Sequence, residues 1–391
     1  MSGAELVTLG CRLNIAESER MRAMMAGERD LVVVNSCAVT REAVRQTRQA
    51  IRRARRANPA ARLIVTGCAA ETEREAIAAM PEVDGLVANA AKLDPRAWNL
   101  PETAPPAPKH RTRAFVAVQN GCDHACTFCV IPQGRGASRS LTIAEVLREV
   151  ERHLMEGAPE IVLTGVDVTS WGHDLPDRPP LGALVHAILE GFPDLARLRM
   201  SSLDGIEIDP LLFELLASEK RLMPHLHLSL QHGHDLILKR MKRRHSRAQA
   251  VKLVSDLRAR RPDLAVGADL IAGFPTESDE HHEANLSIVR ELQIVHCHVF
   301  PYSPRDNTPA ARMPQVDRAI VKARAAELRA VAAATQAEWL ATLVDKPLSV
   351  LAERDGSGYA ENFARIALPD GMAAGTIATL TPRAIEGRLL V

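Results

Sequence analysis

The feature that most constrains the fold of this chain is a repeated alternation of short apolar runs with longer amphipathic stretches. In the central part of the chain, the apolar runs cover residues 114–119, 161–164, 197–201, 226–230, 266–271 and 295–300. Each run has the length of a β-strand, and the stretches between them are long enough for helices. Strands that alternate with helices form parallel βα units. The sequence therefore predicts an α/β protein with six parallel strands in its central region.

Three cysteines, Cys122, Cys126 and Cys129, lie within eight residues directly after the first of these runs. The spacing Cys-x3-Cys-x2-Cys can bind three irons of a [4Fe-4S] cluster and leave the fourth iron open. A structural zinc site needs four closed ligands, and no second cysteine pair follows. A set of disulfides is disfavoured because the chain has seven cysteines, an odd number. The spacing therefore indicates an iron-sulfur cluster, with zinc as the alternative.

Three further cysteines follow β-branched apolar runs near the start of the chain. Cys11, Cys37 and Cys68 end the segments 6–11, 31–37 and 63–68. If these strands are parallel neighbours, their C-terminal ends lie at one edge of a sheet, where open α/β sheets bind ligands. A single buried cysteine is often only a small apolar side chain, but core packing gives no reason for three cysteines to share a strand edge. We therefore expect the three thiols to converge.

The cysteine triplet after a strand-like run is similar to the signature of the radical S-adenosylmethionine (SAM) enzymes. This resemblance implies a partial (β/α)6 barrel in which the open iron binds SAM. Reductive cleavage of SAM then gives a 5′-deoxyadenosyl radical that removes hydrogen from unactivated C–H bonds. Functional groups of such barrels lie beyond the C-terminal strand ends, although glycine-rich loops there are often only turns. The candidate SAM-binding residues at these ends are Gly165, Gln231, Asp269, Gly273 and Glu277.

Over essentially its whole length, the chain resembles the methylthiotransferase family. The motifs that carry the resemblance are Thr8–Asn14, Asn35–Thr40, Thr66–Ala69, the triplet, and Ile131–Gly136. The resemblance implies that Cys11, Cys37 and Cys68 bind an auxiliary [4Fe-4S] cluster whose free iron carries the sulfur to be transferred. One SAM methylates that sulfur and a second provides the radical. Cys297, the one cysteine left over, is predicted to pack in the core.

The family acts on tRNA adenosines beside the anticodon that carry an isopentenyl or a threonylcarbamoyl group, or on an aspartate of a ribosomal protein. Residues 8–14, 163–167 and 298–309 are most similar to the threonylcarbamoyladenosine enzymes. This similarity implies methylthio insertion at C2 of N6-threonylcarbamoyladenosine at position 37 of tRNA. The other two substrates remain alternatives, as does a non-catalytic iron-sulfur protein that binds RNA. Departures from the family pattern at residues 138–141, 228–233 and 275–278 change no cluster ligand.

Two local clusters of basic residues indicate RNA binding, whereas the net charge of +1 does not. Seven arginines crowd residues 41–56, and a second basic run covers residues 239–247. Basic runs are often only solvated surface, but phosphate binding requires clustered cations. An aromatic content of 3% argues against a broad base-stacking platform. The predicted contacts to the tRNA anticodon loop are Arg45, Arg48, Arg52, Lys242 and Arg243.

Four histidines, His225, His227, His232 and His234, invite a metal-binding interpretation. Taking these histidines to have no carboxylate or cysteine neighbours, we expect them to line the barrel instead. The family resemblance also implies an electron donor such as flavodoxin or ferredoxin. The sequence does not identify the sulfur donor.

Changes in composition divide the chain. Residues 1–98 form the predicted N-terminal cysteine domain, an open parallel α/β sheet, and residues 99–112 form a Pro-rich linker. The barrel is predicted over 113–343 and ends in a long helix from residue 316. The apolar runs 348–351, 364–368 and 376–380 within 345–391 predict a small all-β domain that resembles the RNA-binding TRAM domain and packs on the barrel. Without a leader pattern or a long apolar run, we expect a cytoplasmic protein with no membrane partner.

Overall fold

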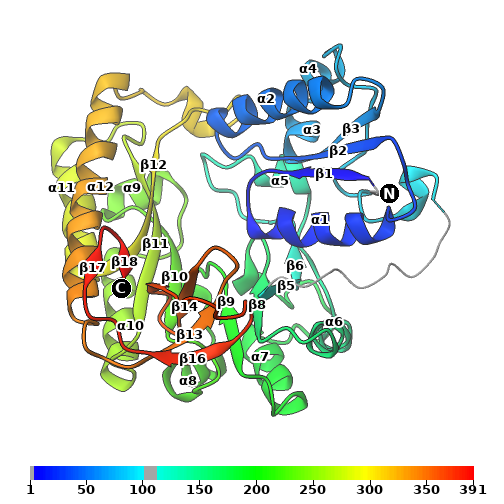
Figure 1. Ribbon diagram of the computed structural model, residues 1–391. Coiled ribbons are helices and arrows are strands. Elements are labelled where there is room, and N and C mark those ends of the chain that lie inside the picture. Colours follow the sequence, from blue (N-terminus) through cyan, green and yellow to red (C-terminus); the bar gives the residue numbers. More distant parts are fainter. Residues whose placement is uncertain (1–3, 101–111) are drawn as a thin grey trace.

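The computed structural model describes residues 4–100 and 112–391 (Figure 1). A parallel sheet near the N-terminus is followed by a larger parallel array of strands and then by a small sheet at the C-terminal end. The predicted linker over 99–112 falls mainly on residues 101–111, which lie outside the described residues. No helix in the described part of the chain is long and apolar enough to cross a membrane.

The N-terminal sheet has four parallel strands in the order β1-β2-β3-β4. The strands are β1 (Glu5–Thr8), β2 (Leu31–Ser36), β3 (Arg62–Gly67) and β4 (Gly85–Leu86). The helices are α1 (Arg12–Met24), α2 (Arg41–Ala57), α3 (Cys68–Thr72), α4 (Arg74–Ala78) and the short 3-10 helix η1 (Pro95–Trp98). Every residue of β2 is buried, as expected for a parallel strand covered on both faces. Met21 of α1 packs with Val33 on one face, and Ile51 of α2 packs with Val34 on the other.

Six parallel strands form the central region, so the predicted α/β architecture is confirmed. They are β5 (Arg113–Ala117), β8 (Glu160–Thr164), β9 (Arg197–Met200), β10 (His225–Gln231), β11 (Ala265–Ala272) and β12 (Ile294–Pro301). Strands β5-β8-β9 and β10-β11-β12 each form a hydrogen-bonded set. Parallel bridges between Leu198 and Leu222 and between Leu203 and Leu228 join the two sets into a partial barrel. A short antiparallel pair, β6 (Gln119–Asn120) and β7 (Arg139–Ser140), lies beside it.

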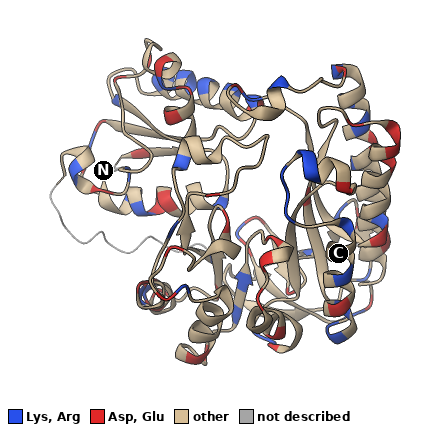
Figure 2. Ribbon diagram, turned by 180° about the vertical axis from the view of Figure 1, so that it is seen from behind, with Lys and Arg blue, Asp and Glu red and all other residues tan. Residues whose placement is uncertain are grey.

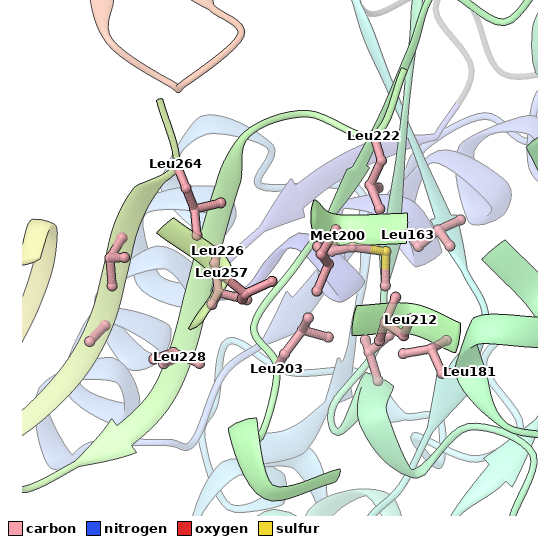
Figure 3. Packing of buried hydrophobic residues seen from close by; sticks show 14 of the residues in the cluster. Leu163, Leu181, Met200, Leu203, Leu212, Leu222, Leu226, Leu228, Leu257 and Leu264 are labelled. Atoms are coloured by element: carbon pink, nitrogen blue, oxygen red, sulfur yellow. The ribbon is translucent and has the colours of Figure 1, made fainter. Parts of the chain in front are cut away.

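Helices pack on the outside of the barrel. They are α6 (Ile143–Met155), α7 (Leu181–Gly191), α8 (Pro210–Ser218), α9 (Asp235–Arg240), α10 (Arg247–Arg260), α11 (Asp279–Glu291) and α12 (Arg318–Ala341), with the 3-10 helices η2 (Val168–Ser170), η3 (Gly205–Glu207) and η4 (Pro309–Arg312). The short helix α5 (Ile131–Arg135) instead packs on α3 of the N-terminal region. Along β10, Leu226 and Leu228 face Leu257 of α10 in the apolar core (Figure 3). The alternate residues His225 and His227 therefore face inward, because successive strand residues point to opposite sides.

The C-terminal sheet has six short strands in the order β16-β13-β14-β15-β18-β17. They are β13 (Leu348–Ala352), β14 (Ser357–Ala360), β15 (Arg365–Ala367), β16 (Ile377–Leu380), β17 (Ile385–Glu386) and β18 (Leu389–Leu390). The three predicted strands correspond to β13, β15 and β16. The core of the sheet includes Leu340 and Leu343 from the end of the α12 region, so it packs on the barrel as predicted.

This small sheet closes the N-terminal end of the barrel. Arg113, the first residue of β5, pairs with Glu353 at 2.8 Å. Arg197, the first residue of β9, donates to the backbone oxygen of Ser349 at 2.7 Å. Phe363 stacks on His225, the first residue of β10, with ring centroids 4.9 Å apart. The C-terminal strand ends, where functional groups of parallel barrels gather, face away from this contact.

Candidate active site

Cys11, Cys37 and Cys68 meet at the C-terminal edge of the N-terminal sheet. The sheet register pairs Thr8 with Asn35 and Ser36 with Gly67, so the strands end side by side. Gly10 has φ +91°, and a Cβ there would lie 2.8 Å from the Cys37 sulfur. Burial raises the pKa of the Cys37 thiol, and the nearby thiols of Cys11 and Cys68 raise it further. Only glycine fits at position 10, because a side chain there would collide with Cys37.

The triplet occupies a loop that begins after β6. Gly121 has φ +78°, and a Cβ there would lie 1.9 Å from the backbone oxygen of Ala137, so the turn requires glycine. Backbone N–H groups point at two of the sulfurs. His124 donates to Cys122 Sγ and Ile131 donates to Cys129 Sγ, each at 3.4 Å. All three cysteines are free, and donors directed at sulfur suit thiolates that ligate iron. The donor set therefore fits three irons of a cluster.

The two cysteine sets lie close together because α5, directly after the triplet, packs on α3, which begins at Cys68. A Cβ on Gly134 of α5 would lie 3.2 Å from the Cβ of Cys68. Asn89 Nδ2 donates to the backbone oxygen of Gly134 at 2.5 Å. The contact involves the backbone itself, so it fixes the two sites relative to each other.

A buried ion network reinforces this contact. Glu17 of α1 pairs with Lys92 at 2.6 Å and with Arg135 of α5 at 3.0 Å, and the three side chains are at most 2% exposed. Arg135 also donates to Asn14 Oδ1 at 2.6 Å. Burial would raise the pKa of Glu17, but the charges of Lys92 and Arg135 hold that pKa below its usual value. The sequence analysis missed this network. Its only local signal is that Glu17 follows Asn14 by three residues, on the same face of α1.

Two of the candidate SAM-binding residues, Gly165 and Gln231, lie at C-terminal strand ends. Gln119 Oε1 accepts hydrogen bonds from the backbone of Val166 at 3.1 Å and of Asp167 at 2.9 Å, which holds the loop after β8. A Cβ on Gly165 would lie 2.9 Å from the Gln119 backbone oxygen. Gln231 ends β10 with φ +69°, a left-handed conformation.

Gly273 and Glu277 are joined by a hydrogen bond between the Gly273 backbone and the Glu277 carboxylate. Glu277 is fully buried, and its carboxylate accepts from the Gly273 backbone at 3.0 Å and from Arg324 at 3.0 Å. His232 Nε2 lies 3.1 Å from the same carboxylate. The placement of Glu277 differs from the expected pocket wall, because its partners lock the loop after β11 to α12. Direct SAM contact by Glu277 stays a prediction, and the geometry assigns it a positioning role.

Asp269 faces the barrel interior between two histidines. Its Oδ1 lies 3.1 Å from His227 Nε2 and 3.0 Å from His298 Nδ1. These three ligand atoms lie within 4.8 Å of one another, a geometry that a metal ion could also use. The histidines were expected to have no carboxylate neighbour, and that expectation was wrong, because Asp269 lies beside His227 and Glu277 lies beside His232. Cys297, by contrast, packs against the main apolar core.

Three of the predicted RNA contacts lie on the exposed face of α2, where Lys and Arg recur in Figure 2. Arg45, Arg48 and Arg52 are 60%, 40% and 54% exposed. They line an open groove together with Arg41 and Arg305, and the carboxylates of Glu73 and Asp306 lie among these arginines. Such clustering suits phosphate binding.

In the second basic run, Lys242 and Arg243 point in different directions. Lys242 is exposed, but the Arg243 side chain is only 7% exposed and donates to Asp204 and to the Ser229 backbone, each at 2.8 Å. Its other terminal nitrogen lies 3.6 Å from Cys126 Sγ. The prediction that Arg243 contacts RNA was therefore wrong. The positive φ of Lys242, +57°, turns the chain so that Arg243 enters the protein beside the triplet.

The sequence analysis also missed the polar side chains around the triplet. His124 lies between Cys122 and Cys126 and pairs with Asp167 at 2.5 Å. Hydrogen bonds to Asp167 and then to Glu207 raise the pKa of His124 to about 10, so it is protonated at neutral pH. Its position inside the Cys-x3-Cys spacing was the available signal.

Comparison with known proteins agrees with this arrangement. The Radical SAM superfamily model matches residues 116–287, and the model of the uncharacterized protein family UPF0004 matches residues 4–88. The threonylcarbamoyladenosine tRNA methylthiotransferase MtaB of Rickettsia prowazekii (strain Madrid E) is 43% identical over 95% of this chain and 93% of its own length. The chain belongs to the radical SAM methylthiotransferase family. Enzymes of this family use SAM and [4Fe-4S] clusters, and the two cysteine sets offer a place for each kind of cluster.

Two other proteins are similar to the chain, one in sequence and one in fold. The tRNA-2-methylthio-N(6)-dimethylallyladenosine synthase of Paracoccus denitrificans (strain Pd 1222) is 32% identical over 89% of this chain and 85% of its own length. The radical SAM methyltransferase TsrM of Kitasatospora setae superposes with a TM-score of 0.55 at 16% identity, covering 77% of this chain and 67% of TsrM. The latter likeness concerns the fold alone.

Proposed function

We propose that this enzyme inserts a methylthio group at C2 of N6-threonylcarbamoyladenosine at position 37 of tRNA. The observation that carries the proposal is the 43% identity, over nearly the full length of both chains, to an enzyme named for that substrate. The relative named for the dimethylallyl substrate is 32% identical. The juxtaposition of two cysteine sets supports the same chemistry, because sulfur insertion at a C–H bond needs a radical and a sulfur source in one place.

The chain offers separate residues for each part of this reaction. Cys122, Cys126 and Cys129 would hold the cluster that binds SAM, and Cys11, Cys37 and Cys68 would hold the auxiliary cluster. When bound, the clusters and two SAM molecules supply the electron, the carbon radical, the sulfur and the methyl group. An electron donor such as flavodoxin or ferredoxin would serve the first cluster.

The protein side chains would position these groups. The pair Glu17 and Arg135 would keep the two clusters at a fixed separation. The SAM pocket would lie beyond the strand ends at Gly165, Gln231, Asp269 and Gly273. In the α2 groove, Arg45, Arg48 and Arg52 would bind phosphates of the anticodon stem-loop, which places the target adenosine by its backbone.

Mass spectrometry of tRNA nucleosides from cells that lack the gene tests the proposal. In a strain with no second enzyme for this modification, methylthio-threonylcarbamoyladenosine should disappear and the unmethylthiolated nucleoside should accumulate. Complementation with the intact gene should restore the product. Unchanged levels of the methylthio nucleoside would refute the proposal, and a selective loss of the methylthio-isopentenyl nucleoside would favour the other tRNA substrate.

A charge-neutralised variant separates a tRNA substrate from a ribosomal protein. Replacing Arg45, Arg48 and Arg52 by alanine should weaken tRNA binding and lower the salt dependence of log Kd by up to about 3. Lys220, Arg318 and Lys322 are exposed cations outside α2, the second basic run and the predicted TRAM-like domain, and their replacement by alanine is the matched control. Equal activity of both triple variants would favour a substrate that is not RNA.

A further inference from the structure

Arg12 carries a positive charge from the cysteine domain into the barrel. It is the first residue of α1 and directly follows Cys11. Its guanidinium carbon lies 5.8 Å from the centroid of the Phe363 ring. The charged groups that act on it, Arg113, Arg199, Glu160 and Asp269, all belong to barrel strands. One residue thus links the predicted auxiliary cluster site to the barrel interior.

The neighbouring charges already have partners. Arg113 pairs with Glu353 at 2.8 Å, and Arg199 pairs with Glu160 at 3.0 Å. Asp269 is shared by two histidines, as described above. Within residues 4–100 and 112–391, the side chain of Arg12 has neither a hydrogen bond nor an ion pair.

Arg12 is therefore a half-buried cation whose guanidinium has no hydrogen-bond acceptor among the described residues. The charges of Arg113 and Arg199 repel it, whereas the carboxylates of Glu160 and Asp269 attract it more weakly. Even so, arginine keeps its charge in proteins. A half-buried guanidinium whose N–H groups have no acceptor in the protein is suited to bind an anion from outside.

An anion can reach this region from solvent. Asp269, whose charge acts on Arg12, is 23% exposed, and its partner His298 is 61% exposed. The barrel interior on this side is therefore open.

We infer that Arg12 binds the carboxylate of the threonylcarbamoyl group on the target adenosine, an inference that rests on the proposed function. In adenosine, only N1 separates C2 from C6, so the substituent on N6 lies on the same side of the ring as the reacting carbon. Arg12 is adjacent to Cys11, where the sulfur source would sit. A guanidinium matches a carboxylate with two parallel hydrogen bonds.

The same contact provides specificity. The isopentenyl group has no charge, so it gains nothing from Arg12 and leaves the guanidinium without its counter-charge. Rejection of a substrate that lacks a required polar group is stronger than rejection by size alone. Arg12 is thus a specificity-determining residue for the threonylcarbamoyl substrate.

A charge-removal cycle tests the inference. Holoenzyme with both clusters is assayed on tRNA that carries threonylcarbamoyladenosine and on the same tRNA with that carboxyl group converted to its methyl ester. For the wild type, the ester should raise KM and, without SAM, the tRNA Kd by about tenfold to hundredfold, the range for a hydrogen bond to a charged group. Arg12→Met should bind the acid form of the tRNA more weakly than the wild type does, by the same factor. It should bind the acid and ester forms equally. Arg22→Met, an exposed site on α1, is the matched control.

The outcomes are distinct. If Arg12→Met still discriminates acid from ester like the wild type, or weakens both equally, the carboxylate is bound elsewhere and the inference is overturned. Arg12→Lys keeps the charge and should show intermediate discrimination, and this variant decides the matter if Arg12→Met loses its clusters or its fold. If Arg12→Met does not fold and Arg12→Lys discriminates the acid from the ester as well as the wild type does, the inference is also overturned. A wild type that makes no methylthio product from the acid tRNA refutes the proposed function instead.

Discussion

The triplet Cys122, Cys126 and Cys129 belongs to one loop, whereas Cys11, Cys37 and Cys68 come from three strand ends separated by 26 and 31 residues. The loop carries its three cysteines within eight residues after a turn fixed by Gly121, and contacts from Arg243 and Asp167 add to that local shape. The strand-end set requires the register of the whole N-terminal sheet, because a slip of one residue would turn each side chain to the other face. We therefore expect the strand-end site to depend on global folding and the triplet on local conformation.

The largest effect should come from Cys126→Ala in the triplet. The variant should lose both SAM cleavage and methylthio product, while the strand-end set still binds iron, because the two sites fold by separate means. Product analysis for 5′-deoxyadenosine and an iron determination check this result. Iron content should fall by roughly half, from about eight to about four per chain. Loss of all iron would show that the two sites are not independent.

Cys37→Ala should give the complementary result. SAM cleavage to 5′-deoxyadenosine should persist, but no methylthio product should form, because the sulfur source depends on the strand-end set. Parallel assays of 5′-deoxyadenosine and methylthio nucleoside measure both steps. Any methylthio product above background from this variant would contradict the auxiliary-cluster assignment.

Glu17→Gln tests the network that joins the two sites. Removing the carboxylate leaves Lys92 and Arg135 buried without a counter-charge, which should cost about 3–5 kcal/mol of folding free energy. The pKa of Glu17 is held below its unfolded value, so its contribution is present at neutral pH and lost as the pH falls through the folded pKa. Urea unfolding across pH measures this. Glu75→Gln, on the exposed side of α4, is the control, and equal losses in both variants would refute the prediction.

Gly67→Ala should produce the smallest effect. Gly67 has φ +90° and precedes Cys68, and a Cβ would lie 2.5 Å from the Ser36 backbone oxygen. The strained backbone should cost about 1–3 kcal/mol and lower iron binding at the strand-end set only. Gly27→Ala has no atom within 4 Å of its added Cβ and serves as the control. If Gly67→Ala keeps full iron content and melting temperature, the strand-end set is less dependent on the sheet than we expect.

The sequence was sufficient for features that short patterns determine. Each of the six barrel strands is a short apolar run, and each strand-end cysteine directly follows one, so local patterns located both. Strand β14 was missed because Ser357–Ala360 shows no apolar alternation and is held by pairing with β13 and β15. Neither the hydrophobic periodicity nor the composition of a segment shows which distant residue a charged side chain will pair with.

The same limit explains the errors in the site. Arg243 looks like its basic neighbours, but Asp204 and the Ser229 backbone, both distant in sequence, draw it inward. Glu17 meets Lys92 and Arg135 only after the N-terminal sheet and the barrel have packed together. Arg12 lies within the motif Thr8–Asn14, but only the folded structure brings it beside Phe363 and the barrel strands.

The stacking of Phe363 on His225 has a consequence for biosynthesis. A ribosome makes every barrel strand before it makes β13–β18, so the emerging barrel has its polar N-terminal end open to water until the last strands are added. During that interval, Arg113 and Arg197 lack the partners that the final sheet provides. Because these two cations gain those partners only from the strands made last, the N-terminal end of the barrel completes its packing only after the whole chain has been made.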